Sequence, residues 1–154
     1  MIPDDQYFVF NIEGQHYASS LSHVEEVIRA VELITLSHSP ELLLGLLNIR
    51  GKFVPVFNIR KKLRLPERDI DLDDRIIVFS AHRYAIAFLV DRVVGVVELT
   101  KEKIESAQQI FPEMEHYIEG VAKFDSDTVI ICNIETLFPA QEIDGLDHVV
   151  EKNV

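Results

Sequence analysis

The strongest constraint on the fold of this chain is an internal repeat. Residues 45–63 match residues 120–138 without a gap, and the identical pairs are Gly45/Gly120, Val54/Val129, Asn58/Asn133 and Ile59/Ile134. Upstream, the hairpin-like pattern of residues 9–18 recurs at residues 78–85. Ordered agreement over two separate stretches favours a duplication over shared composition, so the chain is predicted to fold as two similar halves.

The repeat also predicts where the halves lie. Subdomain 1 is expected at about 7–65, subdomain 2 at about 75–138, and a tail at 139–154. A half of about 65 residues buries little apolar surface and is marginally stable alone, so each is expected to be stabilised by docking onto its twin.

Short apolar runs separated by turn signals predict strands rather than helices. The run at 7–12 alternates, with Phe8, Phe10 and Ile12 on one face. Many short strands with few helices indicate an all-β barrel or sandwich. The predicted strands are 7–12, 15–19, 24–29, 46–50, 52–58, 75–81, 84–90, 93–99, 118–124 and 128–133.

A few short helices are also predicted. Ser39, Pro40 and Gly45 have the order of an N-cap, a first helical residue and a terminating glycine, which predicts one or two turns over 39–45. Similar short turns are expected at 59–63 and 134–137, and a short amphipathic helix from residue 141 onward.

Apolar patterning adds an expectation about burial. Residues 84–90 are apolar at every position and residues 93–97 nearly so. In a strand with one solvent-exposed face, apolar and polar residues alternate. Both faces of these strands are therefore expected to be covered by the other half or by another protein. The single Cys132 lies in an apolar run and is interpreted as a small core hydrophobe in a reducing compartment, the cytoplasm.

Composition excludes several classes of partner. Twenty-six acids against fifteen bases give a net charge of −11, which disfavours nucleic acid and anionic membranes. No stretch reaches 18 uninterrupted apolar residues, so membrane insertion is not expected.

The sequence contains few patterns typical of catalysis, metal binding or nucleotide binding. Residues 45–52 lack the spacing of a phosphate loop, and the histidines lack metal-ligand spacing. The acids of 67–74 are interpreted as a solvated linker. The basic cluster of Arg60, Lys61, Lys62 and Arg64 is interpreted as a solvated short helix or a docking surface. No catalytic, cofactor or metal residue is assigned, and a cysteine enzyme built on Cys132 stays as an alternative.

Arg50 is the candidate functional residue. It follows an apolar strand, after Asn48 and before Gly51, where a hairpin is expected to turn. Its fork of donors suits a carboxylate or backbone carbonyls. Pro55 in the next strand predicts an edge or a bulge, because proline cannot donate to the ladder.

These residues carry a resemblance to a known family. Gly45-x-x-Asn48-Ile49-Arg50-Gly51 followed by Val54-Pro55-Val56-x-Asn58-Ile59-Arg60 resembles the hallmark of the CheW-like chemotaxis coupling proteins. Signature-like stretches at 24–29, 34–35 and 90–96 come in the expected order, and the similarity runs from about Tyr7 to Phe138. The resemblance implies a single CheW-like domain over 1–154, built as two interlocked five-stranded SH3-like barrels with short helices.

The resemblance also implies a function. Members of the family have no catalytic activity and bridge transmembrane chemoreceptors to the histidine kinase CheA, in cytoplasmic arrays on the inner face of the membrane. Arg50, Val24 and Glu26 would border the groove that takes the receptor's cytoplasmic hairpin tip, with Val90 and Val93 on its opposite side.

A second surface is implied for the kinase. Leu42, Leu43 and Gly45 would lie on the first barrel, where the regulatory domain of CheA docks. The chain departs from the family at Asn58, where aspartate is usual. A CheW-like scaffold of a non-flagellar pathway, such as pilus motility, stays as an alternative function.

Overall fold

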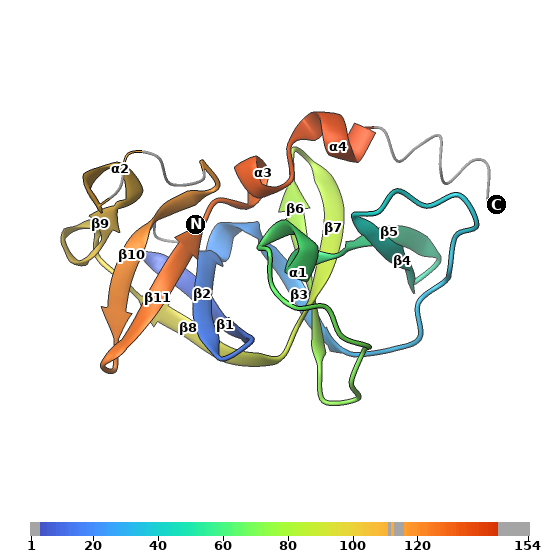
Figure 1. Cartoon of the computed structure of the whole chain (residues 1–154), viewed down its shortest axis with the longest axis horizontal. Coiled ribbons are helices and arrows are strands. Elements are labelled where there is room, and N and C mark those ends of the chain that lie inside the picture. Colours follow the sequence, from blue (N-terminus) through green and yellow to red (C-terminus); the bar gives the residue numbers. More distant parts are fainter. Residues whose placement is uncertain (1–3, 111, 113–115, 145–154) are drawn as a thin grey trace.

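The computed structural model describes residues 4–110, 112 and 116–144, and about half of them lie in strands (Figure 1). The strands are β1 Gln6–Ile12, β2 Gln15–Ser20, β3 Val24–Arg29, β4 Leu43–Ile49, β5 Lys52–Phe57, β6 Arg75–Ala81, β7 Tyr84–Val90, β8 Arg92–Glu98, β9 Glu105–Ser106, β10 Ile118–Phe124 and β11 Asp127–Cys132. The helical segments are η1 Leu21–His23, α1 Ile59–Lys62, η2 Lys101–Lys103, α2 Ala107–Ile110, α3 Ile134–Leu137 and α4 Ala140–Asp144.

The strands form two sheets that exchange hairpins between the sequence halves. The first sheet has the order β8-β1-β2-β11-β10-β9 and the second has the order β3-β6-β7-β5-β4. Hairpin β1–β2 therefore completes a sheet of second-half strands, and hairpin β6–β7 completes a sheet of first-half strands. Each hairpin joins its host sheet through a parallel pair, β2 with β11 and β7 with β5. The predicted all-β class with two repeated barrels is confirmed, whereas the sheets do not follow the sequence division at 7–65 and 75–138.

The two halves repeat each other in local detail. Each of the four tight hairpin turns has two consecutive residues with positive φ, at 13–14, 50–51, 82–83 and 125–126. Such turns match the right-handed twist of antiparallel strands. Asn58 caps α1 by accepting from the Lys61 amide, and Asn133 caps α3 by accepting from Glu135 and Thr136. The helices predicted after both asparagines are confirmed.

The helix predicted over 39–45 is wrong. Residues 41–42 form a turn and β4 begins at Leu43. The Ser39 hydroxyl donates to the Leu43 carbonyl at 3.0 Å instead of accepting from a helical amide. Gly45 does not end a helix either. A Cβ added there would lie 2.6 Å from the Ile34 carbonyl oxygen, so glycine allows the chain at Ile34 to pair beside β4.

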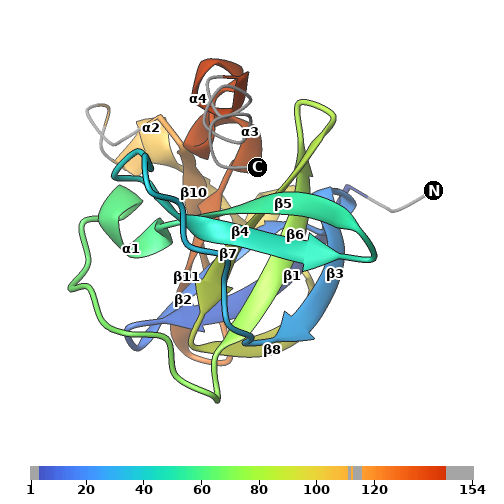
Figure 2. The ribbon, with the colours of Figure 1, turned by 90° about the vertical axis from the view of Figure 1, so that its right-hand side faces the viewer.

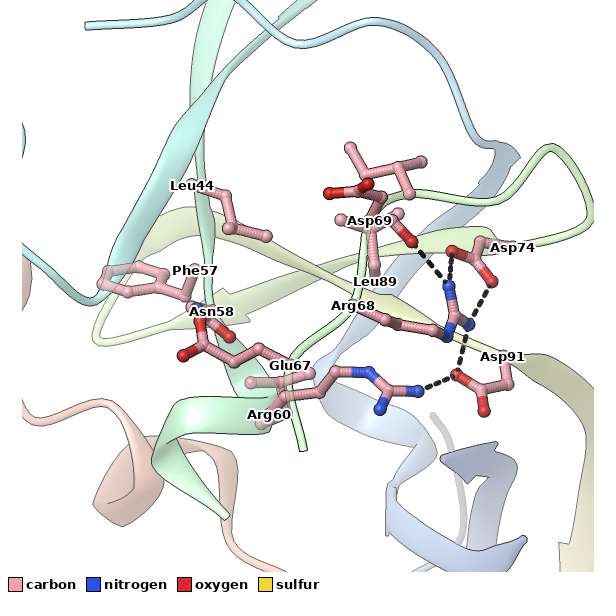
Figure 3. Close-up of a pocket in the computed structure, with 12 residues that line it drawn as sticks. Leu44, Phe57, Asn58, Arg60, Glu67, Arg68, Asp69, Asp74, Leu89 and Asp91 are labelled. Carbon is pink, nitrogen blue, oxygen red and sulfur yellow. Dashed lines mark hydrogen bonds and ion pairs between the residues drawn. The ribbon is translucent and has the colours of Figure 1, made fainter. Parts of the chain in front are cut away.

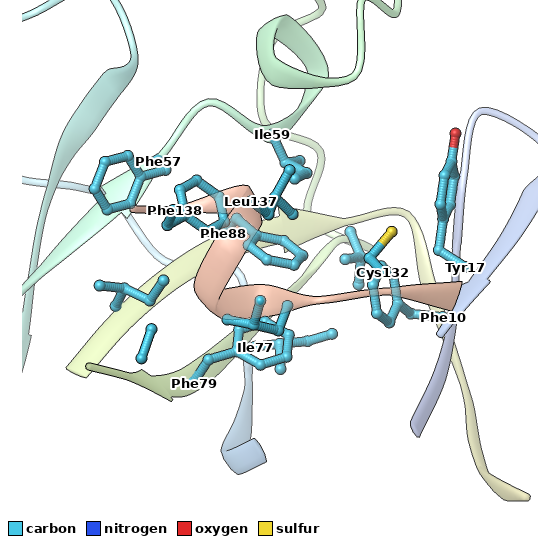
Figure 4. Close-up of a cluster of buried hydrophobic side chains, with 14 of the residues drawn as sticks. Phe10, Tyr17, Phe57, Ile59, Ile77, Phe79, Phe88, Cys132, Leu137 and Phe138 are labelled. Carbon is cyan, nitrogen blue, oxygen red and sulfur yellow. The ribbon is translucent and has the colours of Figure 1, made fainter. Parts of the chain in front are cut away.

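The largest core lies between the two sheets (Figure 4). Phe10 of the first sheet contacts Phe79 and Phe88 of the second, with ring centroids 6.5 and 5.7 Å apart. Alternation along β1 produces this arrangement, because Phe8, Phe10 and Ile12 face the other sheet while Tyr7 and Val9 face a smaller core inside the first. The second sheet has its own small core.

Burial agrees with part of the expectation from apolar patterning. The middle of β7 is buried, and Cys132 is buried in the core between the sheets. β8 differs, because Val94 and Val96 are 44% and 52% exposed and the chain itself leaves this face open. No helix within the described residues is long and apolar enough to cross a membrane. α4 supplies the start of the predicted tail helix, and residues 145–154 of that prediction lie outside the described part.

A candidate interaction site at the Arg50 turn

Arg50 stands at the tip of the β4–β5 hairpin, which faces the viewer in Figure 2. Its φ is +50° and that of Gly51 is +83°, and the Asn48 side chain accepts a hydrogen bond from the Gly51 amide at 2.9 Å. The Arg50 side chain is 78% exposed and donates from Nη2 to Oε2 of Glu26 on β3 at 2.7 Å. The predicted turn is thus confirmed, and two of the predicted receptor-site residues form an ion pair.

A hollow of about 320 Å³ lies beside this ion pair. Its floor is apolar and is made by Ile49, Val54, Val78 and Ala85, while charged side chains line the rest. The charged members are Glu25, Glu26, Arg50 and Lys52. An apolar floor with a charged border is the chemistry that receives one face of an amphipathic helix.

The other predicted receptor residues are less exposed. Val24 and Val93 occupy equivalent places, because Val24 pairs with Phe79 of β6 and Val93 pairs with Phe10 of β1. Both are partly buried against the core between the sheets. Val90 is 1% exposed and belongs to that core, so it can act on a partner only through the residues that it supports.

The predicted kinase residues are also mostly inside. Leu43 and Gly45 are buried, and Leu42 packs partly against the core between the sheets. Leu44, which sequence reasoning passed over, points outward and is 41% exposed. Leu44 lies where the register of β4 shifts between Leu43 and Gly45, and residues 45–47 are all buried, so no regular strand period marks it. The helix predicted over 39–45 also concealed the start of the strand.

Leu44 belongs to an exposed apolar cluster that we call the end face: Val31, Leu44, Ile70 and Leu72. These four side chains line a hollow of about 460 Å³ together with residues 30, 32, 33 and 35. Each of the four is at least 41% exposed. Apolar clusters of this kind mark surfaces that contact other proteins.

An ion-pair network lies beside the end face (Figure 3). Asp91, between β7 and β8, accepts from Arg60 and from Arg68, both at 2.8 Å. Arg60 also donates to Glu13 at the β1–β2 turn, and Arg68 holds Asp74 through two hydrogen bonds of 2.6 and 2.9 Å.

Two predictions fail at this network. Arg60 is not part of a solvated helix surface, because its side chain is 11% exposed. Asp74 is not part of a solvated linker, because its side chain is 5% exposed. The sequence does contain a signal that Asp74 is buried. Arg68 is the one cation within the acidic run of 67–74, and a buried carboxylate requires a cation.

The network shifts the pKa of its members. Burial tends to raise the pKa of Asp91, but hydrogen bonds from the Glu13 amide and from Arg60, with the charges of Arg60 and Arg68, outweigh burial and lower it. Its hydrogen bonds to Asp74 raise the pKa of Arg68. Asp91, Arg60 and Arg68 therefore stay ionised at neutral pH.

Cys132 has the environment of a structural residue. Burial raises the pKa of its thiol to about 12, so the nucleophilic thiolate is scarce at neutral pH. Within the described residues, no three histidine, cysteine or acidic side chains are arranged to hold a metal ion.

The fold consists of two docked barrels, and an ion-paired turn lies beside an apolar hollow on its surface. These features are typical of a protein-binding module. The chain belongs to the CheW-like domain family, whose model matches residues 6–142. Recognition of the family from its motifs is thus confirmed. The family is one of chemotaxis scaffold proteins, which makes the chain an adaptor of the CheW type.

Named relatives agree with this assignment. The chain is 26% identical over 140 residues to a probable chemotaxis protein CheW of Rhizobium etli, covering 90% of each chain. It is 29% identical over 105 residues to the chemotaxis protein CheW of Bacillus subtilis, covering 68% of this chain and 67% of the other. The crystal structure of the scaffolding protein TtCheW from Thermoanaerobacter tengcongensis matches with a TM-score of 0.78 and 26% identity, covering 91% of this chain and 96% of the other.

Proposed function

We propose that the chain is a non-catalytic adaptor that couples transmembrane chemoreceptors to the histidine kinase CheA, in cytoplasmic arrays on the inner face of the membrane. The observation that carries the proposal is the exposed Arg50–Glu26 ion pair beside an apolar hollow, in a member of the CheW-like family. Arg50 contacts the receptor's cytoplasmic hairpin tip directly, and Glu26 orients its guanidinium. Val24, Val93 and the buried Val90 shape the groove from below.

The kinase surface in this proposal is the end face. Leu44 contacts the regulatory domain of CheA, while the buried Leu43 and Gly45 and the half-buried Leu42 hold β4 in place. Because the end face and the Arg50 turn are separate surfaces, one chain binds both partners at once. Residues 7–65 and 75–138 act as two halves of one domain in this arrangement.

Co-sedimentation with receptor-containing membranes tests the receptor surface. Arg50→Glu places a second carboxylate beside Glu26, and we expect it to remove the chain from the membrane pellet. Arg83→Glu is a matched control, because Arg83 is also an exposed arginine with positive φ at a hairpin turn. Unchanged co-sedimentation of Arg50→Glu would show that the receptor does not bind at this turn.

Thiol labelling of the native protein tests the enzyme alternative. We expect Cys132 to resist a neutral-pH thiol reagent until denaturant unfolds the chain, because the thiol is buried and protonated. Rapid labelling of the folded protein would instead favour a reactive cysteine.

A further inference from the structure

The end face is assembled from three separate segments. Val31 comes from the connection after β3, Leu44 comes from β4, and Ile70 and Leu72 come from the connection between α1 and β6. We call residues 64–74 the linker. Two of the four residues of the end face, Ile70 and Leu72, therefore lie on a segment outside both sheets. Leu72 is 89% exposed.

Leu65 packs against the core between the sheets, but from residue 66 onward polar contacts hold the linker in place. A hollow of about 170 Å³ lies between the linker and the second sheet, lined by Leu44, Phe57 and Leu89 among others (Figure 3). Arg68 spans the gap, because it holds Asp74 at the linker's end and Asp91 at the β7–β8 junction. The Asp74 carbonyl also accepts from the Ala30 amide at 3.2 Å, beside Val31.

Charge on the end face has one sign. Asp69, Asp71 and Asp73 alternate with Ile70 and Leu72 along the linker and are exposed, and Glu32 lines the same hollow. Of the nearby cations, Arg68 is neutralised by Asp74 and Asp91, and Arg75 donates to the backbone carbonyls of Asp73 and Asp74. A partner that buries the leucines therefore meets uncompensated carboxylates at the edge of the contact, which favours lysine and arginine on the partner.

We propose that Arg68 is the positioning residue of the end face: by joining Asp74 to Asp91, it holds Ile70 and Leu72 beside Leu44 and Val31, and the assembled face binds an apolar surface bordered by lysine and arginine. This inference rests on the proposed function, in which the partner is the regulatory domain of CheA. It adds that the surface exists only while the linker is anchored.

Binding of purified CheA regulatory domain from the same organism tests the proposal. We expect Leu72→Ser to weaken binding about tenfold, because a leucine buried at the interface is lost. Arg68→Met should weaken binding to a similar extent, although it removes no apolar contact. Ile110→Ser and Lys101→Met are the matched controls, since both residues are exposed and lie near β9 and β10, and they should bind like the wild type.

A double-mutant cycle separates positioning from a structural effect. If Arg68 acts by holding Leu72, the Arg68→Met/Leu72→Ser protein should bind about as weakly as either single variant. Losses that multiply to about a hundredfold would show that the two residues act independently and would overturn the positioning role. Asp73→Asn should reduce the salt dependence of binding, and an unchanged dependence would contradict the basic border.

Amide hydrogen exchange on the free chain makes failure of this inference distinguishable from failure of the proposed function. Arg68→Met should speed exchange in residues 69–74, whereas Lys101→Met should not. If the wild type does not bind CheA, the proposed function fails, whatever exchange shows. If the wild type binds CheA and exchange is unaffected by Arg68→Met, the linker is not anchored by Arg68 and this inference alone is wrong.

Discussion

At the scale of single residues, Arg50 occupies a backbone conformation that favours glycine, asparagine or aspartate. Its φ of +50° places an arginine where an L side chain costs about 1 kcal/mol. The Arg50 side chain, which pairs with Glu26, is 78% exposed, and such an exposed ion pair contributes little to the free energy of unfolding. The ion pair therefore does not offset the conformational cost of the positive φ at Arg50. Such an uncompensated cost is expected of a side chain that serves binding.

Ser126 has the same strain without an assigned role. It is equivalent to Gly51 in the repeat and has a φ of +73°. We expect Ser126→Gly to raise the free energy of unfolding by about 0.5–1 kcal/mol, because glycine adopts this conformation without a steric penalty. Urea denaturation measures the change, and Thr128→Gly, inside β11, should be destabilising in the same assay. A destabilised Ser126→Gly protein would contradict the interpretation.

Asn58 explains a departure from the family pattern. Its Oδ1 caps α1, which an aspartate also does, but its Nδ2 donates to Glu67 at 2.6 Å, which an aspartate cannot. We expect Asn58→Asp to lower the free energy of unfolding by about 1–2 kcal/mol, since two carboxylates would then face each other. In a Glu67→Gln background the same substitution should be nearly neutral. An equal loss in both backgrounds would rule out the repulsion.

At the scale of elements, the tip of each of the two exchanged hairpins, β1–β2 and β6–β7, is tied to a helix that follows a strand of the other sheet. Glu13 at the β1–β2 tip pairs with Arg60 of α1, and His82 at the β6–β7 tip lies 3.7 Å from the carboxylate of Glu135 in α3. Arg60 and Glu135 are equivalent in the repeat, so the acid and the base have changed places. Both contacts join the first sheet to the second.

The first of these joints gives a pH dependence through Asp91. Its folded-state pKa is below the ordinary value of 3.8, so its contribution to stability is complete above about pH 4 and is lost as pH falls through the folded pKa. We expect Asp91→Asn to cost about 3 kcal/mol at pH 7, because Arg60 and Arg68 lose a charged partner. The difference between the urea midpoints of the variant and the wild type should be largest at pH 7 and should narrow from pH 4 to pH 3. A constant gap would exclude Asp91 as the titrating group.

Local elements were predictable because their signals are local. The turn at Arg50–Gly51 and the short helices after Asn58 and Asn133 each depend on residues that are neighbours in the sequence. The Arg68–Asp91 contact joins residues that are far apart in the sequence, and no pattern in the sequence marks it. Leu44 was missed because the capping signal at Ser39 predicted a helix, and because the register shift between Leu43 and Gly45 interrupts the strand period there.

At the scale of the whole molecule, the hairpin exchange was beyond sequence reasoning. The two halves offer equivalent strands, β5 and β11, so hairpin β1–β2 has a similar edge to pair with in its own half and in the other. The strand propensity of the hairpin does not specify which of these two edges it joins. The choice is made by the large core between the sheets, which is a property of the complete chain.

The exchange predicts how fragments behave. We expect neither 1–70 nor 71–154 to unfold cooperatively alone, because each lacks the hairpin that completes its sheet. An equimolar mixture should regain the circular dichroism of the intact chain, because both sheets are then complete. A fragment that melts cooperatively by itself would show that its half is an independent domain.

β7 passes into β8 through a single residue, Asp91, although the two strands belong to different sheets. The junction is one residue long, and its side chain is held by Arg60 and Arg68. We therefore expect the two barrels to move together as one rigid body. In the proposed function, a receptor that tilts one barrel would tilt the other with it, and the kinase would receive the movement as a displacement of the whole adaptor rather than as a change of its shape.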